Sequence, residues 1–170
     1  MRRVTTILLS VVLLFSAVAV ARNDAGYWSL QAVDLGNDYF IRSLLPLPSD
    51  RLALAGDWLR VPPSVDGASI PINNLFVQLH GPDGSVDWTL TVPGSGNTEF
   101  AQLAQDPDSG DLFAVGRSWP SEGVTDVFVV RISEQGELIW EREFREPGTQ
   151  QASSVAVIPG DGLVLAGMTI

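Results

Sequence analysis

A short motif that recurs three times along this chain limits the fold more than any other feature. The motif LALAG at 52–56 returns as LFAVG at 112–116 and as LVLAG at 163–167. Self-similarity at a period of roughly 20–50 residues is typical of solenoids, propellers and other arrays built from one repeated unit. The sequence therefore predicts an array of similar units.

The tryptophans follow the same spacing. Three of them, Trp28, Trp88 and Trp140, lie 60 and 52 residues apart. The offset of 60 also superposes Phe40 on Phe100, and the offset of 52 superposes Phe76 on Phe128. So many coincidences in one register are hard to obtain by chance, which supports the repeat.

The first segment is interpreted separately, as an export signal. Residues 1–3 are a basic start, residues 7–20 are mostly apolar, and residues 19–21 (AVA) supply a small-x-small cleavage pattern. We predict that residues 1–21 are a signal peptide, so that the mature chain begins at Arg22 and is secreted or periplasmic. The alternative is an uncleaved membrane anchor, although the apolar stretch is short for a span. We expect no membrane span after cleavage.

Composition excludes several classes of protein. The chain has no cysteine, so neither a disulfide nor a lipid-modified N-terminal cysteine can form. Its formal net charge is −10, and the mature chain would reach −12 because the predicted signal carries Arg2 and Arg3. Such an acidic chain argues against a nucleic-acid partner.

The periodicity after the signal is that of strands. Apolar residues alternate or run in short blocks between Gly, Pro, Asp and Ser, which is the pattern of strands joined by tight turns. We predict four antiparallel strands in each complete unit, over 39–92 and 99–145, and a partial unit at 152–170. A lone four-stranded sheet cannot bury both faces, whereas stacked sheets cover one another.

We therefore predict an all-β fold of antiparallel four-stranded, propeller-type blades. Residues 22–170 would form an incomplete domain of about two complete blades with partial flanking blades. A closed ring usually needs four or more blades. We accordingly expect the chain to be an N-terminal fragment of a longer array.

Two blade endings carry a resemblance to a known family. Residues 84–88 (GSVDW) and 136–140 (GELIW) resemble the Gly-x-x-x-Trp endings of quinoprotein-like and related secreted bacterial β-propeller repeats. The resemblance covers nearly all of 26–170 and implies the fold. The quinoprotein dehydrogenases have a longer Ala-x-Asp-x-x-Thr-Gly lead that neither ending retains. The resemblance therefore implies no quinone, and we predict no cofactor.

Familiar catalytic motifs are absent from the sequence. It contains no HExxH, no GxSxG, no Walker loop and no cysteine nucleophile. The single histidine, His80, aligns with Ile132, so we predict a structural role for it. Residues 106–111 (DPDSGD) could offer oxygen ligands to calcium, but the equivalent turns do not keep the acidic spacing, and we interpret them as a hairpin turn. We predict neither a catalytic residue nor a metal site.

The best candidate for binding is one face of the array. The segment after 60 is about eight residues longer than its counterpart in the next unit, and loops on a rigid scaffold commonly carry binding. That face would display the speculative ligand-binding residues Trp58, Arg60, Arg117 and Trp119. Exposed aromatics beside arginines are typical of recognition surfaces. The alternative is that both tryptophans merely pack against the loop bases.

Three hypotheses about function follow. The leading one is a non-catalytic secreted β-propeller repeat module that binds an unknown protein or carbohydrate partner. The second is the N-terminal part of a quinoprotein-like or glycan-active propeller enzyme whose catalytic residues lie beyond Ile170. The third is self-association, in which incomplete blades of two or more chains complete one another.

Overall fold

The computed structural model describes residues 18–22, 28–32, 38–60, 72–92, 97–121, 123–160 and 162–170. The described residues form strands, turns and short connections, without a helix. The predicted fold class is confirmed at the level of an all-β chain with antiparallel four-stranded sheets. Within the same ranges, no helix is available that could span a membrane.

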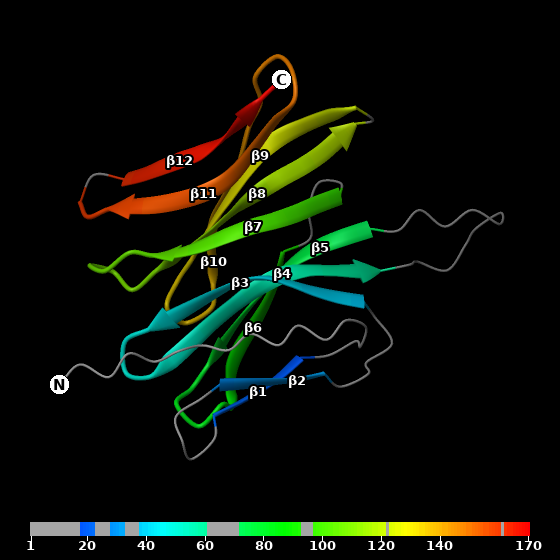
Figure 1. The fold of residues 1–170 in the computed structure, drawn as a ribbon. Coiled ribbons are helices and arrows are strands. Elements are labelled where there is room, and N and C mark those ends of the chain that lie inside the picture. The colour runs from blue at the N-terminus through cyan, green and yellow to red at the C-terminus, as the bar shows by residue number, and fades with distance from the viewer. Residues whose placement is uncertain are drawn as a thin grey trace.

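The described part of the chain contains twelve strands, arranged as in Figure 1. They are β1 (Val18–Arg22), β2 (Trp28–Ala32), β3 (Asp38–Leu47), β4 (Arg51–Arg60), β5 (Ile72–His80), β6 (Val86–Val92), β7 (Asn97–Gln105), β8 (Leu112–Ser121), β9 (Val124–Ile132), β10 (Leu138–Phe144), β11 (Gln150–Ile158) and β12 (Gly162–Thr169).

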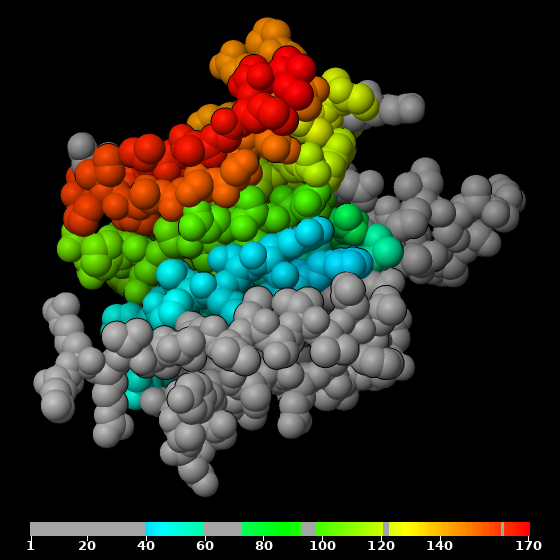
Figure 2. Space-filling model, in the orientation of Figure 1, coloured from blue at the N-terminus to red at the C-terminus, as the bar shows by residue number. Residues whose placement is uncertain are grey.

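These strands pair with their sequence neighbours in four antiparallel sheets. The first sheet is β3-β4-β5-β6, the second sheet is β7-β8-β9-β10, the third sheet is β11-β12, and β1-β2 form an N-terminal hairpin. The first, second and third sheets lie as successive layers, which Figure 2 shows as bands from cyan through green to red. Each layer therefore has a neighbour against which it can bury an apolar face.

Two hydrophobic cores lie between the layers. The first core joins the first and second sheets through residues such as Leu75, Val77, Leu112 and Val130. The second core joins the second and third sheets through Val115, Val129, Ala152 and Val155. Because β9 contributes Val130 to one core and Val129 to the other, it is buried on both faces. This explains why its sequence is a nearly continuous apolar run rather than an alternation.

The glycine of the recurring motif lies opposite a β-bulge in each of the three sheets. The register shifts lie between Ile41 and Ser43, between Phe100 and Gln102, and between Ala152 and Ser154. The facing glycines are Gly56, Gly116 and Gly167. A Cβ on Gly56 would overlap the carbonyl oxygen of Phe40, and the other two glycines meet the same obstacle. The motif ends in glycine because the neighbouring backbone leaves no room for a side chain.

The register corrects one detail of the sequence alignment. Ile41 pairs with Gly56, whereas Phe100 pairs with Gly116. Phe100 is therefore the structural counterpart of Ile41 and not of Phe40. Between equivalent ladder pairs, the connection from Gln105 to Leu112 is one residue longer than the connection from Pro46 to Leu52, so a single sequence offset cannot align both strands of the hairpin.

The sequence predicted a strand near Trp28, which is β2, but it did not predict β1 or the pairing of the two strands. Strand β1 contains residues 18–21, which also form the end of the predicted signal peptide, and it pairs with β2 from Val18 opposite Ala32 to Arg22 opposite Trp28. Residues 1–17 and the extended loop at 61–71 lie outside the described residues. Cleavage after Ala21 therefore stays a prediction.

Candidate functional site

A polar groove crosses the first strands of the three stacked sheets. It has a volume of about 360 Å³ and is lined by Arg42 of β3, residues 99–101 of β7, Arg117 of β8 and residues 151–153 of β11. We call it the bulge groove, because it lies where β3, β7 and β11 each carry a β-bulge.

The bulges themselves supply part of the lining. Each bulge leaves one residue of the first strand without a partner in the ladder, namely Arg42, Ala101 and Ser153. All three line the bulge groove. A bulge redirects a side chain and increases local twist, so the backbone irregularity that requires the motif glycine also builds the groove.

Charged and amide side chains in the groove form one connected network. Arg42 donates to Asp57 (Nε to Oδ2, 2.8 Å), and its other nitrogen lies 3.6 Å from Glu99. Arg117 donates to the same Glu99 (Nη2 to Oε2, 2.5 Å) and to Gln151 (Nη1 to Oε1, 2.7 Å). The network thus connects side chains from all three stacked sheets.

Asp57 is the buried member of this network. Its side chain is 1% exposed, and it also accepts the backbone N–H of Phe100 at 2.6 Å. Burial raises the pKa of Asp57 above its usual 3.8, and the hydrogen bonds from Arg42 and Phe100, which favour the charged form, oppose that rise. Asp57 therefore ties β4 to the start of β7 while it holds the Arg42 guanidinium at the groove.

The four predicted binding residues have different environments. Arg117 lines the bulge groove, and its guanidinium carbon lies 4.5 Å from the centre of the Trp119 ring, which is a cation–π contact. Trp58 packs against a hydrophobic cluster that contains Leu52, Leu54 and Phe76. Arg60 ends β4, and its side chain lies outside the described part of the chain. The structure thus brings Arg117 and Trp119 together.

The sequence interpretation missed Arg42, Glu99, Asp57 and Gln151. A signal for Asp57 existed, because it directly follows the motif glycine and holds the position of Arg117 in the second unit. The other three belong to first strands, whose bulges shift the register and cannot be located from periodicity alone.

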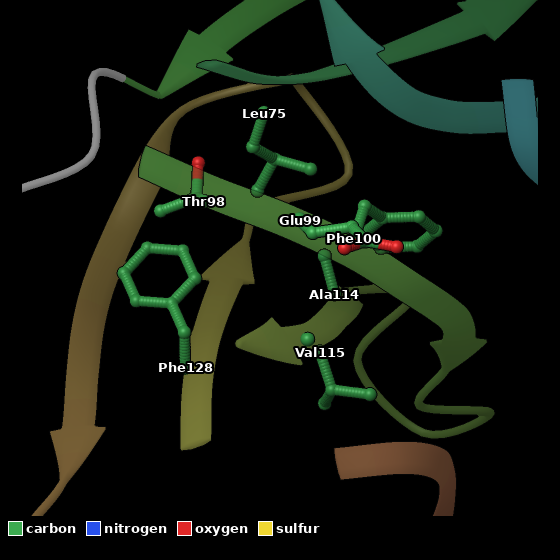
Figure 3. A pocket seen from close by; sticks show the side chains of 8 residues that line it. Leu75, Thr98, Glu99, Phe100, Ala114, Val115 and Phe128 are labelled. Carbon is green, nitrogen blue, oxygen red and sulfur yellow. The ribbon is translucent and has the colours of Figure 1, made fainter. Parts of the chain in front are cut away.

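A second gap lies deeper, between the first and second sheets, and Figure 3 shows its lining. Leu75, Phe100, Ala114 and Phe128 surround it, and among these described side chains no room remains for a water molecule. It is a packing seam of the first core, and we assign no ligand to it.

The remaining polar candidates have structural roles. His80 is fully buried, and its Nδ1 lies 3.2 Å from the carbonyl oxygen of Gly84, so Nδ1–H is the donor. Burial lowers the pKa of His80 below its usual 6.5, which keeps the ring neutral.

In the acidic turn at 106–111, Asp106 accepts from the backbone N–H of Asp108 and the hydroxyl of Ser109. Asp111 pairs with Arg131 at 2.6 Å. Over the described residues, no group of three or more His, Cys, Asp or Glu side chains is placed to hold a metal ion.

The sequence matches no protein-family model, and no curated protein is significantly similar to it.

Proposed function

We propose that this chain is an exported, non-catalytic repeat module of the β-propeller type, which binds a polar partner in the bulge groove. Equivalent contacts between successive first strands support the blade-like arrangement. The Ser43 hydroxyl in β3 accepts the N–H of Leu103 in β7 at 3.2 Å. The side-chain amide oxygen (Oε1) of Gln102 in β7 accepts the N–H of Val155 in β11 at 2.9 Å. Repetition of this contact keeps the first strands side by side, as blades around an axis require.

The observation that carries the proposed function is the convergence of three sheets on one polar groove. Its lining side chains project from strands rather than from long loops, so their positions are constrained by the sheets. A bound ligand would contact residues of all three sheets at once.

The charges of the groove favour a neutral, hydroxyl-rich ligand. The two guanidiniums of Arg42 and Arg117 face the two carboxylates of Asp57 and Glu99, so the network is close to electrically balanced. Donors and acceptors alternate along it, and the Trp119 ring lies beside Arg117. The volume of about 360 Å³ lies within the range of small-molecule sites. We therefore assign a short neutral oligosaccharide to the groove, with a peptide loop as the other ligand to be tested.

Binding to a glycan array, followed by calorimetry on the best ligand, tests this assignment. Arg117→Ala removes the contacts to Glu99, Gln151 and Trp119, and we expect it to weaken binding at least about tenfold, which corresponds to about 1.4 kcal/mol. Arg145→Ala is the matched control, because Arg145 forms an exposed pair with Glu143 and does not line the groove. Equal loss in both variants, or no loss in Arg117→Ala, would refute the assignment.

Two expectations from the sequence stay predictions. The enzyme hypothesis concerns catalytic residues beyond Ile170, so the residues described here do not test it. Export requires the N-terminal segment, and N-terminal sequencing of the protein from its native host tests whether the leader is removed.

A further inference from the structure

We propose that the bulge groove gains affinity for anionic oligosaccharides when the surroundings become acidic, because a buried carboxyl group of its network takes up a proton. This property rests on the proposed function, since it concerns the charge of the ligand that the same groove binds. At neutral pH the groove takes the neutral oligosaccharide assigned above. At acidic pH it favours an oligosaccharide that carries a sulfate or carboxylate group.

The carboxyl group is that of Asp57. Its side chain is 1% exposed, whereas the side chain of Arg42, which donates to it at 2.8 Å, is 41% exposed. Arg42 also lines the groove. The ion pair therefore has a buried negative end and a positive end that a ligand can reach.

Two charged side chains act on Asp57 from the elements packed around it. Within the described residues they are Arg42 of β3 and Glu99 of β7. Strand β5 places the apolar Leu75 opposite Asp57 in the ladder, and β8 contributes Arg117 through its pair with Glu99. The state of Asp57 therefore depends on the groove network itself.

Burial and sharing both favour the neutral form of Asp57. Burial raises the pKa of Asp57 above its usual 3.8, and the charge of Glu99 acts in the same direction. The hydrogen bonds from Arg42 and from the Phe100 N–H oppose this rise. Asp57 also shares Arg42 with Glu99, whereas Glu99 has Arg117 as a second partner. We therefore expect Asp57 to take up a proton at a higher pH than an ordinary aspartate.

Protonation changes the charge of the groove and preserves its main tie. Asp57 accepts the Phe100 N–H through Oδ1 at 2.6 Å and the Arg42 Nε–H through Oδ2. A carboxyl group that carries its proton on Oδ2 keeps Oδ1 as an acceptor, so the tie between β4 and β7 remains. The charged bond to Arg42 is lost, which leaves its Nε–H free to donate to a ligand.

The charges of the network explain the change in ligand preference. When Asp57 and Glu99 are ionised, they balance the guanidiniums of Arg42 and Arg117. A proton from solvent on Asp57 leaves one positive charge in excess. An anionic group of the ligand then pairs with Arg42 without competition from the buried carboxylate, in a charge-assisted hydrogen bond.

The charge of the whole chain strengthens this dependence. Its formal net charge is −10 at pH 7, so an anionic ligand meets general repulsion while the groove is neutral. Acidification lowers that repulsion and adds the local positive charge. Binding and protonation are also reciprocal, because a ligand that prefers the protonated groove raises its protonated fraction.

Calorimetry with a matched pair of ligands tests the proposal. The probes are a short sulfated oligosaccharide, whose charge stays constant, and its unsulfated parent, each titrated into the full chain between about pH 7.5 and about pH 4.5 at constant ionic strength. We expect the sulfated probe to bind at least about threefold more tightly at the acidic end, and the parent to change by less than about twofold. In two buffers of different ionisation enthalpy, the sulfated probe should also show proton uptake on binding.

Two variants identify the group that takes up the proton. Asp57→Asn imitates the neutral form, because its amide oxygen can still accept the Phe100 N–H. It should bind the sulfated probe at neutral pH about as tightly as the unmodified chain does at acidic pH, without a further gain on acidification. Glu143→Gln is the matched control, because it removes a carboxylate that pairs with Arg145 outside the groove. It should keep the pH dependence of the unmodified chain.

The possible results separate this property from the proposed function. If the parent binds but the sulfated probe gains no affinity on acidification, or binds without proton uptake, the acid dependence is refuted and the proposed function stands. The same holds if Asp57→Asn keeps the full pH dependence. If Asp57→Asn does not fold, the proton uptake of the unmodified chain decides. If neither probe binds at any pH, the proposed function fails and the acid dependence fails with it.

Discussion

The two interfaces between the stacked sheets use the same geometry but bury different amounts of apolar surface. Between the first and second sheets, four strands cover four, and Leu75, Val77 and Val130 are at most 2% exposed. Between the second and third sheets, two strands cover four, and Leu163 and Leu165 are only partly buried. The burial of a residue in such a stack thus depends on how complete the neighbouring sheet is.

The hydrogen bonds between the first strands are the same at both interfaces, although the apolar burial differs. The hydrogen bond from the Leu103 N–H to Ser43 recurs as the bond from the Val155 N–H to Gln102. These bonds fix how one first strand lies against the next, whereas the apolar area sets how strongly the sheets adhere. Mutations can therefore test separately the hydrogen bonds that position the first strands and the apolar packing that holds the sheets together.

The largest expected effect on stability comes from a leucine-to-alanine substitution in the first core, compared with the same substitution in the second core. Leu75→Ala empties a fully packed site in the first core, and we expect it to lower the free energy of unfolding by about 2–5 kcal/mol. Leu165→Ala removes a side chain that is only partly buried, so we expect about 1 kcal/mol. Urea denaturation followed by tryptophan fluorescence measures both, and a larger loss in Leu165→Ala would reverse the comparison.

Removal of Asp57 should have the next largest effect. Asp57→Ala leaves the buried N–H of Phe100 without its acceptor and releases Arg42, so we expect a loss of about 1–3 kcal/mol. Gln102→Ala removes the acceptor of the Val155 N–H at the second interface, where the partners are less buried, and should cost less. If thermal and urea unfolding rank Gln102→Ala as the more damaging variant, the alignment contacts do not depend on burial as we infer.

The ends of the third strands respond differently to pH. His80 in β5 is buried and its pKa is lowered, whereas the equivalent position in β9 is Ile132. Stability linked to His80 is complete above its unfolded pKa of 6.5 and declines as the pH falls below it, by at most about 1.4 kcal/mol per pH unit for one proton. Unfolding midpoints between pH 7.5 and 5.5 measure this decline. His80→Ile should flatten it, and an unchanged slope would assign the pH dependence to other groups.

The smallest effect concerns the two equivalent tryptophans. Trp88→Phe loses the hydrogen bond to Glu134, so we expect the isolated chain to lose about 0.5–1.5 kcal/mol. Trp140→Phe should cost less, because Trp140 contacts the Phe113 ring and the Arg142 guanidinium, and a phenylalanine ring retains contacts of both kinds. Urea denaturation followed by circular dichroism measures both variants. A larger loss in Trp140→Phe would reverse this ranking.

The sequence predicted those features that depend on local backbone chemistry. Alternation in β6 and apolar runs in β9 indicate strands, and the glycines at 84 and 136 have positive φ values of 86° and 87° in the turns before the tryptophan strands. The all-β fold class and the four-stranded antiparallel sheets could be predicted from such signals.

The bulge groove was harder to predict, because its lining residues are brought together by β-bulges and by the stacking of separate sheets. Arg42 and Glu99 come from different sheets, and nothing in the spacing of the charged residues predicts that Glu99 pairs with both Arg42 and Arg117. Trp58 and Trp119 were both expected on the binding face, yet Trp58 has an apolar cluster beside it. Trp58 lies two residues after its motif glycine and Trp119 lies three residues after its own, so the two tryptophans hold different positions in the repeat.

The bulges have a consequence for how such a groove can diversify. Because Arg42, Ala101 and Ser153 have no partner in the ladder, a change of side chain there does not alter a neighbouring strand's pairing. The three positions already hold a cation, a methyl group and a hydroxyl. Selection, or a designed library confined to these three codons, can therefore vary ligand preference while the scaffold that presents it stays constant.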